Sequence, residues 1–179
     1  FAGLAVDLRE MRELADRYGF KILEDASHAT GASYLGEPVG SAWADATVFS
    51  FHAVKIVTTA EGGMITTNDD DLARKLRLLR SHGMTREQDQ MEGESEGGWY
   101  YEQIALGYNY RLTDMQSALG LSQLGKLDAW QRRRVESADR YDRLFAGMPL
   151  RLPARLQDRE SAWHLYGIQL GDEVAARRA

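Results

Sequence analysis

The sequence predicts an α/β domain whose strands form a largely parallel sheet. Short apolar runs typical of buried strands occupy residues 20–25, 46–51 and 62–67, and amphipathic helix patterns occupy 7–20 and 68–83. Strands that alternate with helices along a chain usually lie parallel in one sheet. Such sheets bind ligands beyond the carboxyl ends of their strands.

The first helix is expected over residues 7–20. Asp7 and Glu10 form a capping-box pattern, and Gly19 is a typical C-terminal stop. The apolar residues recur every three or four positions and so share one helical face: Leu8, Met11, Ala15 and Tyr18.

The run at 20–25 suits a buried strand that ends at Glu24 and Asp25. The Gly-rich stretch 28–45 is expected to be a loop with room for a small hairpin. The strands at 46–51 and 62–67 then flank Lys55. Asp25 and Lys55 each follow a predicted strand, so both could face one crevice.

The second helix is expected over 68–83, with Asn68 as its cap, Asp71 three residues later and Gly83 as its stop. Its inward residues are Leu72, Leu76 and Leu79. The polar, Gly-rich stretch 84–99 is expected to be a mobile surface loop.

Two further helices are predicted in the C-terminal half. Thr113 and Gln116 form a capping box before the first, and a long helix is expected over about 126–146. Pro149 and Pro153 follow it, and "AWHLYGIQL" at 162–170 is expected to be a strand. The apolar side of the long helix carries Leu127, Trp130, Ala138, Tyr141 and Phe145.

Composition excludes several classes of protein. The 179 residues carry a net charge of −5, which argues against a nucleic-acid surface, and "RRR" at 132–134 reads as a solvated helix face. There is no cysteine, hence no disulfide framework, and the histidines lack the spacing of a zinc motif, so no metal site is expected. No stretch is apolar enough to span a bilayer, and a cytoplasmic location is expected.

Lys55 allows three interpretations: a solvated charge, a phosphate-binding lysine or a nucleophile. The chain has no G-x-x-x-x-G-K-[ST] sequence, which excludes a Walker-type phosphate loop. Asp25 and Ser50 lie near Lys55 in the predicted topology, and Gly62 and Gly63 follow it. A lysine, a carboxylate, a hydroxyl and glycines suit an aldehyde cofactor such as pyridoxal phosphate. Spacing alone leaves a solvated charge and a nucleophile open.

Longer blocks of sequence resemble a known family. The blocks cover about residues 2–168, and they are similar to successive segments of the DegT/StrS-type nucleotide-sugar aminotransferases: "ILEDASHATGASYLGEPVGS", "ATVFSFHAVKIVTTAEGGMITTND", "LRLLRSHGMTR" and "WYYEQIALGYNYRLTDMQSALGLSQL". Within the family, "TTAEGG", "WYYEQ" and "WHLY" most resemble the branch that serves pseudaminic acid biosynthesis.

The resemblance implies an aspartate-aminotransferase-like fold, that of the fold type I pyridoxal-phosphate enzymes. Residues 1–123 would be part of the large, cofactor-binding domain. Residues 124–179 would be the connecting long helix and the start of the small C-terminal domain. Both domains would be incomplete, because family members carry a phosphate-binding turn before the segment that matches residue 1 and more small domain after 179. The chain therefore resembles a central fragment.

The resemblance also implies roles for individual residues. Lys55 would be the Schiff-base lysine and the acid/base of the reaction, and Asp25 would be the partner of the pyridine nitrogen. His28 would lie by the ring face or the phenolic oxygen of pyridoxal phosphate. Ser50 would bind its phosphate, and Asn109 would reach the phosphate in the other subunit of a homodimer with shared active sites.

Each of these residues also has a purely structural interpretation: a turn cap for Asp25, a buried packing group for His28, local hydrogen bonds for Ser50 and Asn109. His52 and His164 are expected to pack or to support the site, although a histidine beside the substrate is possible. Many relatives have proline at the position of Ala53 and glycine at that of Ala60.

The function implied is amino transfer, with glutamate as the expected donor, to a 4-keto nucleotide sugar. A UDP-linked 4-keto-6-deoxy-N-acetylhexosamine is favoured, with perosamine- or aminoarabinose-type sugars as alternatives. A sugar dehydratase of the same fold is disfavoured, because such relatives replace the lysine by histidine. A non-catalytic truncated paralogue or dimerisation module remains the rival from another class. No nucleic-acid or membrane partner is expected.

Overall fold

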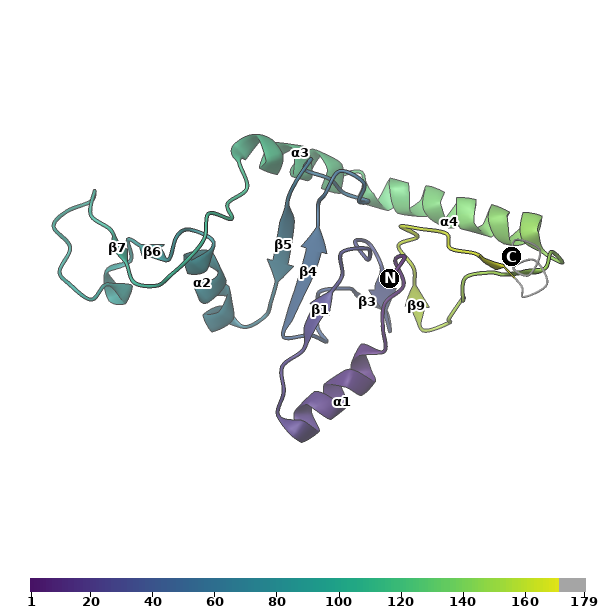
Figure 1. Ribbon diagram of the computed structural model, residues 1–179, viewed down its shortest axis with the longest axis horizontal. Coiled ribbons are helices and arrows are strands. Elements are labelled where there is room, and N and C mark those ends of the chain that lie inside the picture. Colours follow the sequence, from purple (N-terminus) through teal and green to yellow (C-terminus); the bar gives the residue numbers. More distant parts are fainter. Residues whose placement is uncertain (171–179) are drawn as a thin grey trace, which may run out of the picture.

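The computed structural model describes residues 1–170 as an α/β chain (Figure 1). The helices are α1 (Leu8–Tyr18), α2 (Asp70–Leu79), the short 3-10 helix η1 (Gln88–Gln90), α3 (Asp114–Leu124) and α4 (Leu127–Phe145). The strands are β1 (Leu23–Asp25), β2 (Ser33–Tyr34), β3 (Glu37–Pro38), β4 (Ala46–Ser50), β5 (Gly63–Thr66), β6 (Met84–Thr85), β7 (Glu102–Gln103), β8 (Leu150–Arg151), β9 (Arg159–Glu160) and β10 (Gln169–Leu170). Among these residues, no helix combines the length and the apolar character that crossing a membrane requires.

The central sheet of residues 1–170 has the order β1-β4-β5. β1 lies parallel to β4, whereas β5 is antiparallel to β4. The prediction of a largely parallel sheet is therefore wrong for β5. The reason is the connection, because a parallel return needs a crossover, usually a helix. Residues 51–62 instead fold back directly, and the Phe51 amide donates to the Gly62 carbonyl at 2.8 Å.

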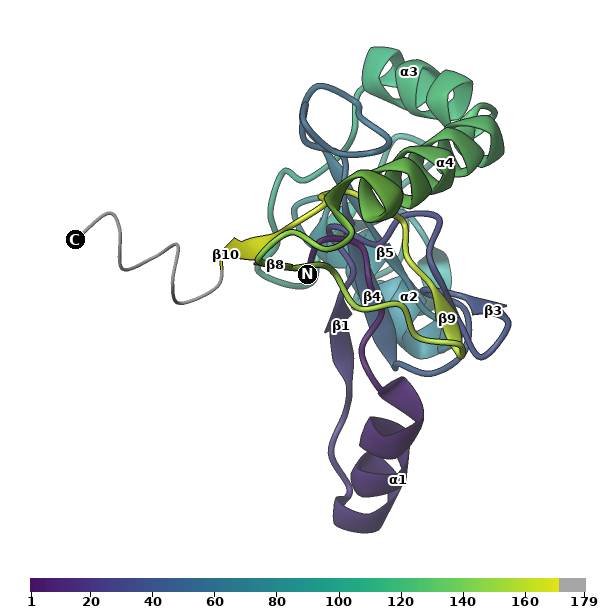
Figure 2. The same cartoon turned by 90° about the vertical axis from the view of Figure 1, so that its right-hand side faces the viewer.

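Helices cover the two ends of this sheet rather than only its faces. In Figure 2, α3 and α4 run across one end, and α1 lies at the other. One core cluster lies between α1 and the β2–β3 hairpin, and it contains Ala5, Leu8, Ala15, Ile22 and Tyr34. A second lies beneath Leu127 of α4, and it contains Ala26, Ala29, Ala32, Ile56 and Ala162. Apart from Ile56, the residues of this second cluster are alanines, which allow close backbone approach.

α1 shows how tertiary contacts override a local pattern. Gly19 ends the helix in the left-handed conformation, with φ 71°, as predicted. The capping box is wrong, because the Asp7 side chain makes no cap hydrogen bond. Its carboxylate pairs instead with the buried guanidinium of Arg159, which also donates to the Ala5 carbonyl at 2.8 Å.

The predicted apolar face of α1 is only half right. Leu8 and Ala15 are buried, whereas Met11 and Tyr18 are exposed. Neither exposed residue belongs to the core cluster that covers Leu8 and Ala15.

The loop at 28–45 does contain the small hairpin, formed by β2 and β3. Leu35 and Gly36 at its turn have φ values of 52° and 83°, as the two-residue turns that match strand twist require. β9 adds to β2 from far along the chain, pairing Ser33 with Glu160. The structure thus ties the start of the described chain to its end.

The helix predicted over 68–83 is shorter, and its cap lies one residue later than predicted. α2 starts at Asp70, and Asp69 caps it by accepting from the amides of Asp71 and Leu72 at 2.9 and 3.0 Å. The prediction of Asn68 as cap is wrong, because its side-chain amide bonds the carbonyl of Ser41. The helix ends at Leu79, ahead of Gly83.

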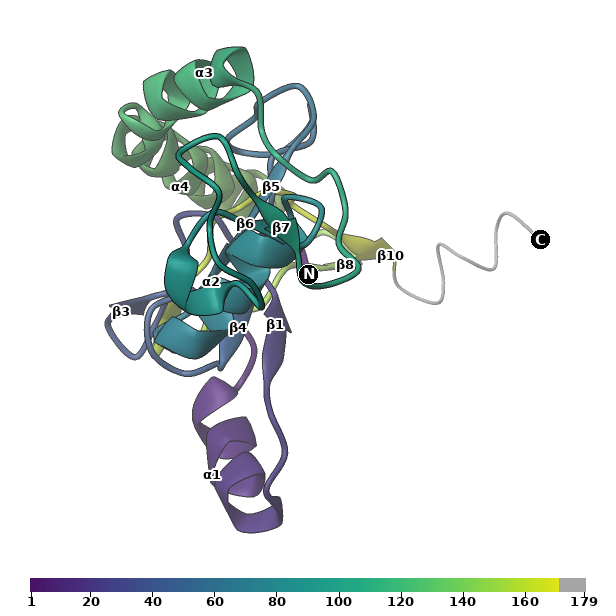
Figure 3. The ribbon, with the colours of Figure 1, turned by 90° about the vertical axis from the view of Figure 1, so that its left-hand side faces the viewer.

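The segment expected to be an irregular loop at 84–99 belongs to a hairpin arm. β6 and β7 pair at its base, and the carboxylate of Glu102 accepts from the amides of Glu92 and Gly93. Figure 1 shows the arm beyond α2, away from the central sheet, and Figure 3 views the molecule from that side. Its mobility stays a prediction.

The C-terminal half follows the predictions until residue 162. The capping box of Thr113 and Gln116 is present, and α4 has nearly the predicted bounds. The strand predicted over 162–170 is reduced to β10, which pairs with β8. Trp163 has φ 48°, a left-handed conformation that interrupts any strand. The division into two domains at residue 124 stays a prediction.

Candidate functional site

The pairing of β1 with β4 brings Asp25 and Ser50 to the same end of the sheet. Asp25 ends β1 and lies in register with Val48, and Ser50 lies two residues further along β4. Both strands run in the same direction, so their carboxyl ends meet there. The sequence predicted one crevice for Asp25 and Lys55, and the topology places Asp25 and Ser50 at the edge where such a crevice would lie.

Lys55 lies in the loop that follows β4. Its amide donates to the His52 carbonyl at 2.9 Å, which makes a tight turn of residues 52–55. The lysine is half-buried, as is Ser50. We call residues 51–62 the lysine loop.

Asp25 is exposed, and within residues 1–170 no cationic side chain forms a salt bridge with it. The Ser27 amide donates to its Oδ1 at 3.0 Å. Hydrogen bonds from the hydroxyl and the amide of Ser27 lower the pKa of Asp25, and the charges of His28 and Lys55 lower it further. The carboxylate is therefore ionised at neutral pH and keeps free acceptor capacity.

His28 is half-buried beside this carboxylate. Its Nδ1 accepts from the Ala2 amide at 3.3 Å, so the neutral ring carries its proton on Nε2. Burial lowers the pKa of His28, and the positive charge of Lys55 contributes in the same direction. The rings of Phe1 and His164 both pack against the ring of His28, with centroids 5.4 and 4.5 Å from its own. These contacts favour one fixed orientation of the His28 ring.

The positive charge of Lys55 affects the pKa values of several of these groups. It lowers the pKa of Asp25 as an opposite charge, and it lowers the pKa values of His28 and His164 by repulsion. Lys55 therefore lies within electrostatic reach of two segments that are distant in the sequence. Of the predicted site residues, Asp25, His28, Ser50 and Lys55 thus gather at one end of the sheet.

α3 holds the lysine loop through two glutamines that sequence reasoning did not assign to the site. Gln123 Oε1 accepts from the Thr58 amide at 3.0 Å, and Gln116 Nε2 donates to the Glu61 carbonyl at 2.8 Å. Their spacing of two helical turns, on the side of α3 nearest the lysine loop, was the available signal. The sequence predicts Gln116 only as the partner of Thr113 in a capping box.

The return of the lysine loop to β5 depends on close packing. A Cβ on Gly62 would lie 2.3 Å from Thr59 Oγ1, so glycine is required there. Ala60 has φ 66°, which explains why glycine suits this position in relatives. His52 Nδ1 lies 2.9 Å from Glu61 Oε1, and this exposed contact closes the base of the loop.

Asn109 lies in a different part of the molecule. It is exposed and forms an isolated β-bridge with Ser81, just beyond the end of α2. The neighbouring amides of Tyr108 and Tyr110 donate to Leu79 and Arg80. Its predicted role was contact with the site of another subunit, and the single chain does not test that role.

The converging residues fit the cofactor that the resemblance implies. They supply an amine, an ionised carboxylate, a hydroxyl and a neutral imidazole from two segments, residues 25–28 and 50–55. The Nδ1 atom of His164, at the same place, is buried without a hydrogen-bond partner in the described chain. Within residues 1–170, no group of three or more His, Asp or Glu residues is placed to hold a metal ion.

Curated relatives resemble nearly the whole chain. SpsC of Bacillus subtilis, a spore coat polysaccharide biosynthesis protein, is 43% identical over 98% of this chain and 45% of its own length. A UDP-4-amino-4,6-dideoxy-N-acetyl-beta-L-altrosamine transaminase of Helicobacter pylori is 43% identical over 94% of this chain and 42% of its own length. The chain therefore spans less than half the length of these relatives.

Solved structures confirm the expected aminotransferase fold. PseC of Helicobacter pylori, an aminotransferase of pseudaminic acid biosynthesis, matches with a TM-score of 0.89 at 38% identity, over 99% of this chain and 46% of PseC. The sugar aminotransferase Spr1654 of Streptococcus pneumoniae, in its PLP form, matches with a TM-score of 0.80 at 31% identity, over 96% and 46%. The family model that matches residues 1–179 confirms the resemblance seen in the sequence, and the chain belongs to the DegT/DnrJ/EryC1/StrS aminotransferase family.

Proposed function

We propose that this chain is part of a sugar aminotransferase that uses pyridoxal phosphate, with Lys55 as its central residue. The observation that carries the proposal is the convergence of Asp25, His28 and Lys55 at the carboxyl end of β1 and β4. Because the chain belongs to an aminotransferase family, we interpret these residues as part of a pyridoxal-phosphate site. Titratable groups that lie together and have shifted pKa values are typical of functional sites.

When bound, pyridoxal phosphate supplies an aldehyde carbon that carries the amino group and a ring that accepts electrons. Lys55 would hold the cofactor through Nζ and, once its amine is free, would move the proton at the reacting carbon. Asp25 would hold a proton on the ring nitrogen. An exposed carboxylate with a lowered pKa suits that task, because it stays ionised at neutral pH.

The remaining predicted residues would bind and orient the cofactor. His28 carries its proton on Nε2, and this N–H would donate a hydrogen bond to an oxygen on the cofactor ring. Ser50 would donate its hydroxyl to the phosphate. Asn109 would bind the phosphate in a second copy of the chain, which makes a homodimer part of the proposal. Its exposed position, with the exposed rings of Tyr108 and Tyr110 beside it, leaves it available to another subunit.

We further propose that the acceptor is a UDP-linked 4-keto-6-deoxy-N-acetylhexosamine and that L-glutamate donates the amino group. The names of two relatives support this choice, since one is an altrosamine transaminase and another an aminotransferase of pseudaminic acid biosynthesis. Sugars of the perosamine or aminoarabinose type are the alternatives. The cytoplasmic location expected from the sequence stays a prediction.

Two rival functions make different demands on the same residues. A dehydratase of this fold would not need the lysine, so Lys55 disfavours it. A non-catalytic dimerisation module would not need Asp25 to keep an ionised carboxylate without an ion-pair partner, as it does in residues 1–170.

The test uses the full-length protein that contains this chain, with pyridoxal phosphate, L-glutamate and a panel of 4-keto nucleotide sugars. Formation of an amino sugar from the UDP-linked N-acetylated substrate is the expected result. Amination of another keto sugar only would correct the substrate. No amination of any of them, from a protein that binds the cofactor, would contradict the proposed transaminase.

A further inference from the structure

His164 is a second imidazole beside the proposed cofactor site, and the sequence predicts for it no specific contact with the cofactor. Its ring centroid lies 4.5 Å from that of His28, at an interplanar angle of 50°. The two histidines come from opposite ends of the described chain. Their contact therefore depends on how residues 161–165 return to the site.

Several backbone contacts fix that return. The Ala162 amide donates to Gly3 at 2.9 Å, and the Leu165 amide donates to Ala2 at 3.2 Å. Arg134 of α4 donates to the Trp163 carbonyl at 2.9 Å. Trp163 itself has φ 48°, a conformation that a tryptophan keeps only where its surroundings enforce it. His164 is therefore held in place on both sides of its own backbone.

The Nδ1 atom of His164 is buried and has no hydrogen-bond partner within residues 1–170. Buried polar atoms in folded proteins nearly always have one, because an unpaired nitrogen loses its hydration without compensation. A phenylalanine would fill the same space beside His28 without that loss. The nitrogen therefore has a use that packing alone does not explain.

Burial and the charges near His164 favour one kind of hydrogen-bond partner for its Nδ1 atom. Burial lowers the pKa of His164, and so do the charges of His28, Lys55 and Arg134. The ring is thus neutral at neutral pH, with one N–H to donate. Lys55 and Arg134 are cations at neutral pH, so an oxygen that carries negative charge would be attracted there.

We propose that His164 is a binding residue whose Nδ1–H donates to an anionic oxygen of the molecule held at Lys55. This inference rests on the proposed function. Two molecules could supply such an oxygen at that place: pyridoxal phosphate through its ring oxygen, and the amino-acid donor through its carboxylate. Both molecules would offer an anionic oxygen as the acceptor. The Kd of pyridoxal phosphate reports on the first, and the KM for L-glutamate reports on the second.

The test compares His164→Phe with His164→Asn in the full-length protein. Phenylalanine keeps the ring beside His28 but removes both nitrogens, whereas the asparagine amide places a polar atom near the position of Nδ1. Three quantities are measured: the Kd of pyridoxal phosphate for the cofactor-free protein, the KM for L-glutamate, and the Tm without cofactor.

For His164→Phe we expect a loss of about 10-fold to 100-fold, as for other hydrogen bonds to charged groups. The loss falls on the Kd if the oxygen belongs to the cofactor, and on the KM if it belongs to glutamate. The Tm without cofactor should stay the same or rise, and His164→Asn should recover most of the affinity.

Unchanged Kd and KM in His164→Phe would overturn the inference. A lower Tm without cofactor in His164→Phe that His164→Asn restores would also overturn it, because Nδ1 would then have a protein partner. If the unaltered protein binds no pyridoxal phosphate, the proposed function fails first, and this inference fails with it.

Discussion

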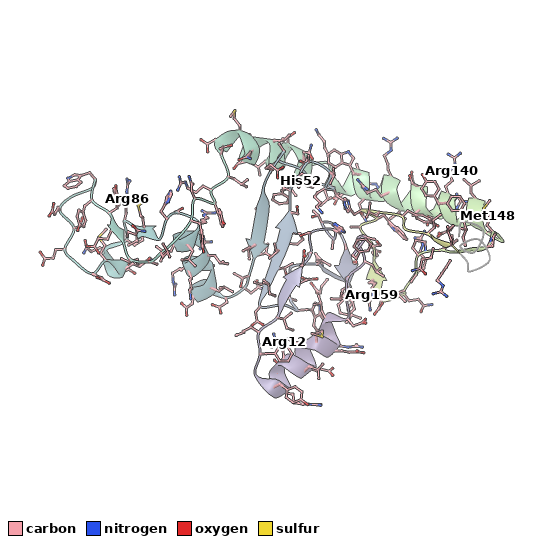
Figure 4. All side chains as sticks on the ribbon, in the orientation of Figure 1. Arg12, His52, Arg86, Arg140, Met148 and Arg159 are labelled. Carbon is pink, nitrogen blue, oxygen red and sulfur yellow. The ribbon has the colours of Figure 1, made fainter. Side chains whose placement is uncertain are left out.

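Two aspartates at opposite ends of the β1–β4 pair show how differently one side chain can be used. Asp45 lies at the amino ends, where it accepts from the Ile22 amide at 2.8 Å, Lys21 at 2.9 Å and Arg12 at 3.1 Å. Asp25 lies at the carboxyl ends, where, among the residues that the structure describes, only Ser27 donates to it. In Figure 4, the labels of Arg12 and His52 mark these two ends of the sheet.

The pKa values of both carboxyls are lowered, so the direction of the shift does not separate them. The Ile22 amide first, and Lys21 next, lower the pKa of Asp45 to about 2. What separates the two aspartates is the number of partners. Asp45 is satisfied within the chain, which is the arrangement of a structural residue, whereas Asp25 keeps acceptor capacity that a ligand could use.

The strongest contrast between the two ends is expected from their lysines. Lys55→Ala in the full-length protein should lower the rate of amino transfer at least about 1,000-fold, because both attachment and proton transfer are lost. Lys21→Ala, at the amino end, should leave the rate within about 2-fold, since Lys21 is an exposed partner of Asp45. Steady-state rates with one keto sugar measure both. Equal losses in the two variants would remove the distinction.

Asp25→Asn should separate function from stability at the carboxyl end. We expect kcat to fall about 100-fold, as for other groups that stabilise charge in a reaction, with little change in Tm. The neighbouring Glu24→Gln is the matched control, because Glu24 points to the other face and bonds Thr47 at 3.0 Å. A fall in Tm without a fall in kcat would make Asp25 a structural residue after all.

Asn109 tests whether the carboxyl-end site is complete in one chain. Asn109→Ala should weaken binding of pyridoxal phosphate about 10-fold, the effect of one hydrogen bond to a charged group. A hybrid dimer of Lys55→Ala and Asn109→Ala subunits should contain one unaltered site if Asn109 acts across the interface.

The hybrid should therefore recover about half of the wild-type rate per dimer, an expectation that follows from closed two-fold symmetry. If it is no more active than the Asn109→Ala homodimer, the contact across the interface is refuted.

Asp45→Asn should show the opposite pattern to Asp25→Asn. The folded-state pKa of Asp45 is about 2, below its value in the unfolded chain, so its stabilisation is present above about pH 4 and is lost as pH falls towards 2. We expect a loss of about 1–2 kcal/mol at neutral pH, after allowance for the exposed Lys21. Chemical denaturation across this pH range measures it.

In the same experiment, Asp16→Asn is the control for Asp45→Asn, because Asp16 is an exposed partner of Arg12. It should cost less than about 0.5 kcal/mol. A difference between wild type and Asp45→Asn that does not shrink below pH 4 would exclude the ionised carboxylate as its cause.

The smallest effect is expected in the lysine loop. Ala60→Gly should stabilise the full-length protein by about 0.5–1 kcal/mol, because Ala60 has φ 66° and glycine adopts that conformation freely. Ala53→Gly is the control, since Ala53 is not among the residues with positive φ, and it should destabilise slightly. Equal effects on the Tm would show that the left-handed turn carries no strain.

The sequence predicted the parts of the fold that depend on local patterns. The capping box at Thr113, the long helix α4 and the stop at Gly19 are all present. The parts that it missed depend on contacts between distant segments. Asp7 pairs with Arg159 instead of capping α1, and β9 joins β2. No helical or strand period encodes such a partner.

The candidate site shows the same limit. The positions of Asp25 and Lys55 after strands suggested a shared crevice, and the register of β1 on β4 provides it for Asp25 and Ser50. The placement of His164 beside His28 could not be predicted, because it depends on the left-handed Trp163 within a stretch that reads as a strand. The contacts of Gln116 and Gln123 of α3 with the lysine loop were also not predicted, because the capping box accounted for Gln116 and no local pattern singled out Gln123.

The central claim, that the carboxyl end of β1 and β4 holds pyridoxal phosphate through Lys55, has one direct test. Full-length protein is incubated with the cofactor and treated with borohydride, which fixes a lysine-bound cofactor permanently, and its peptides are then mapped by mass spectrometry. The modification should lie on Lys55, and in Lys55→Ala it should disappear. A modification on Lys21, Lys75 or Lys126 instead, or none on any lysine, would contradict the account.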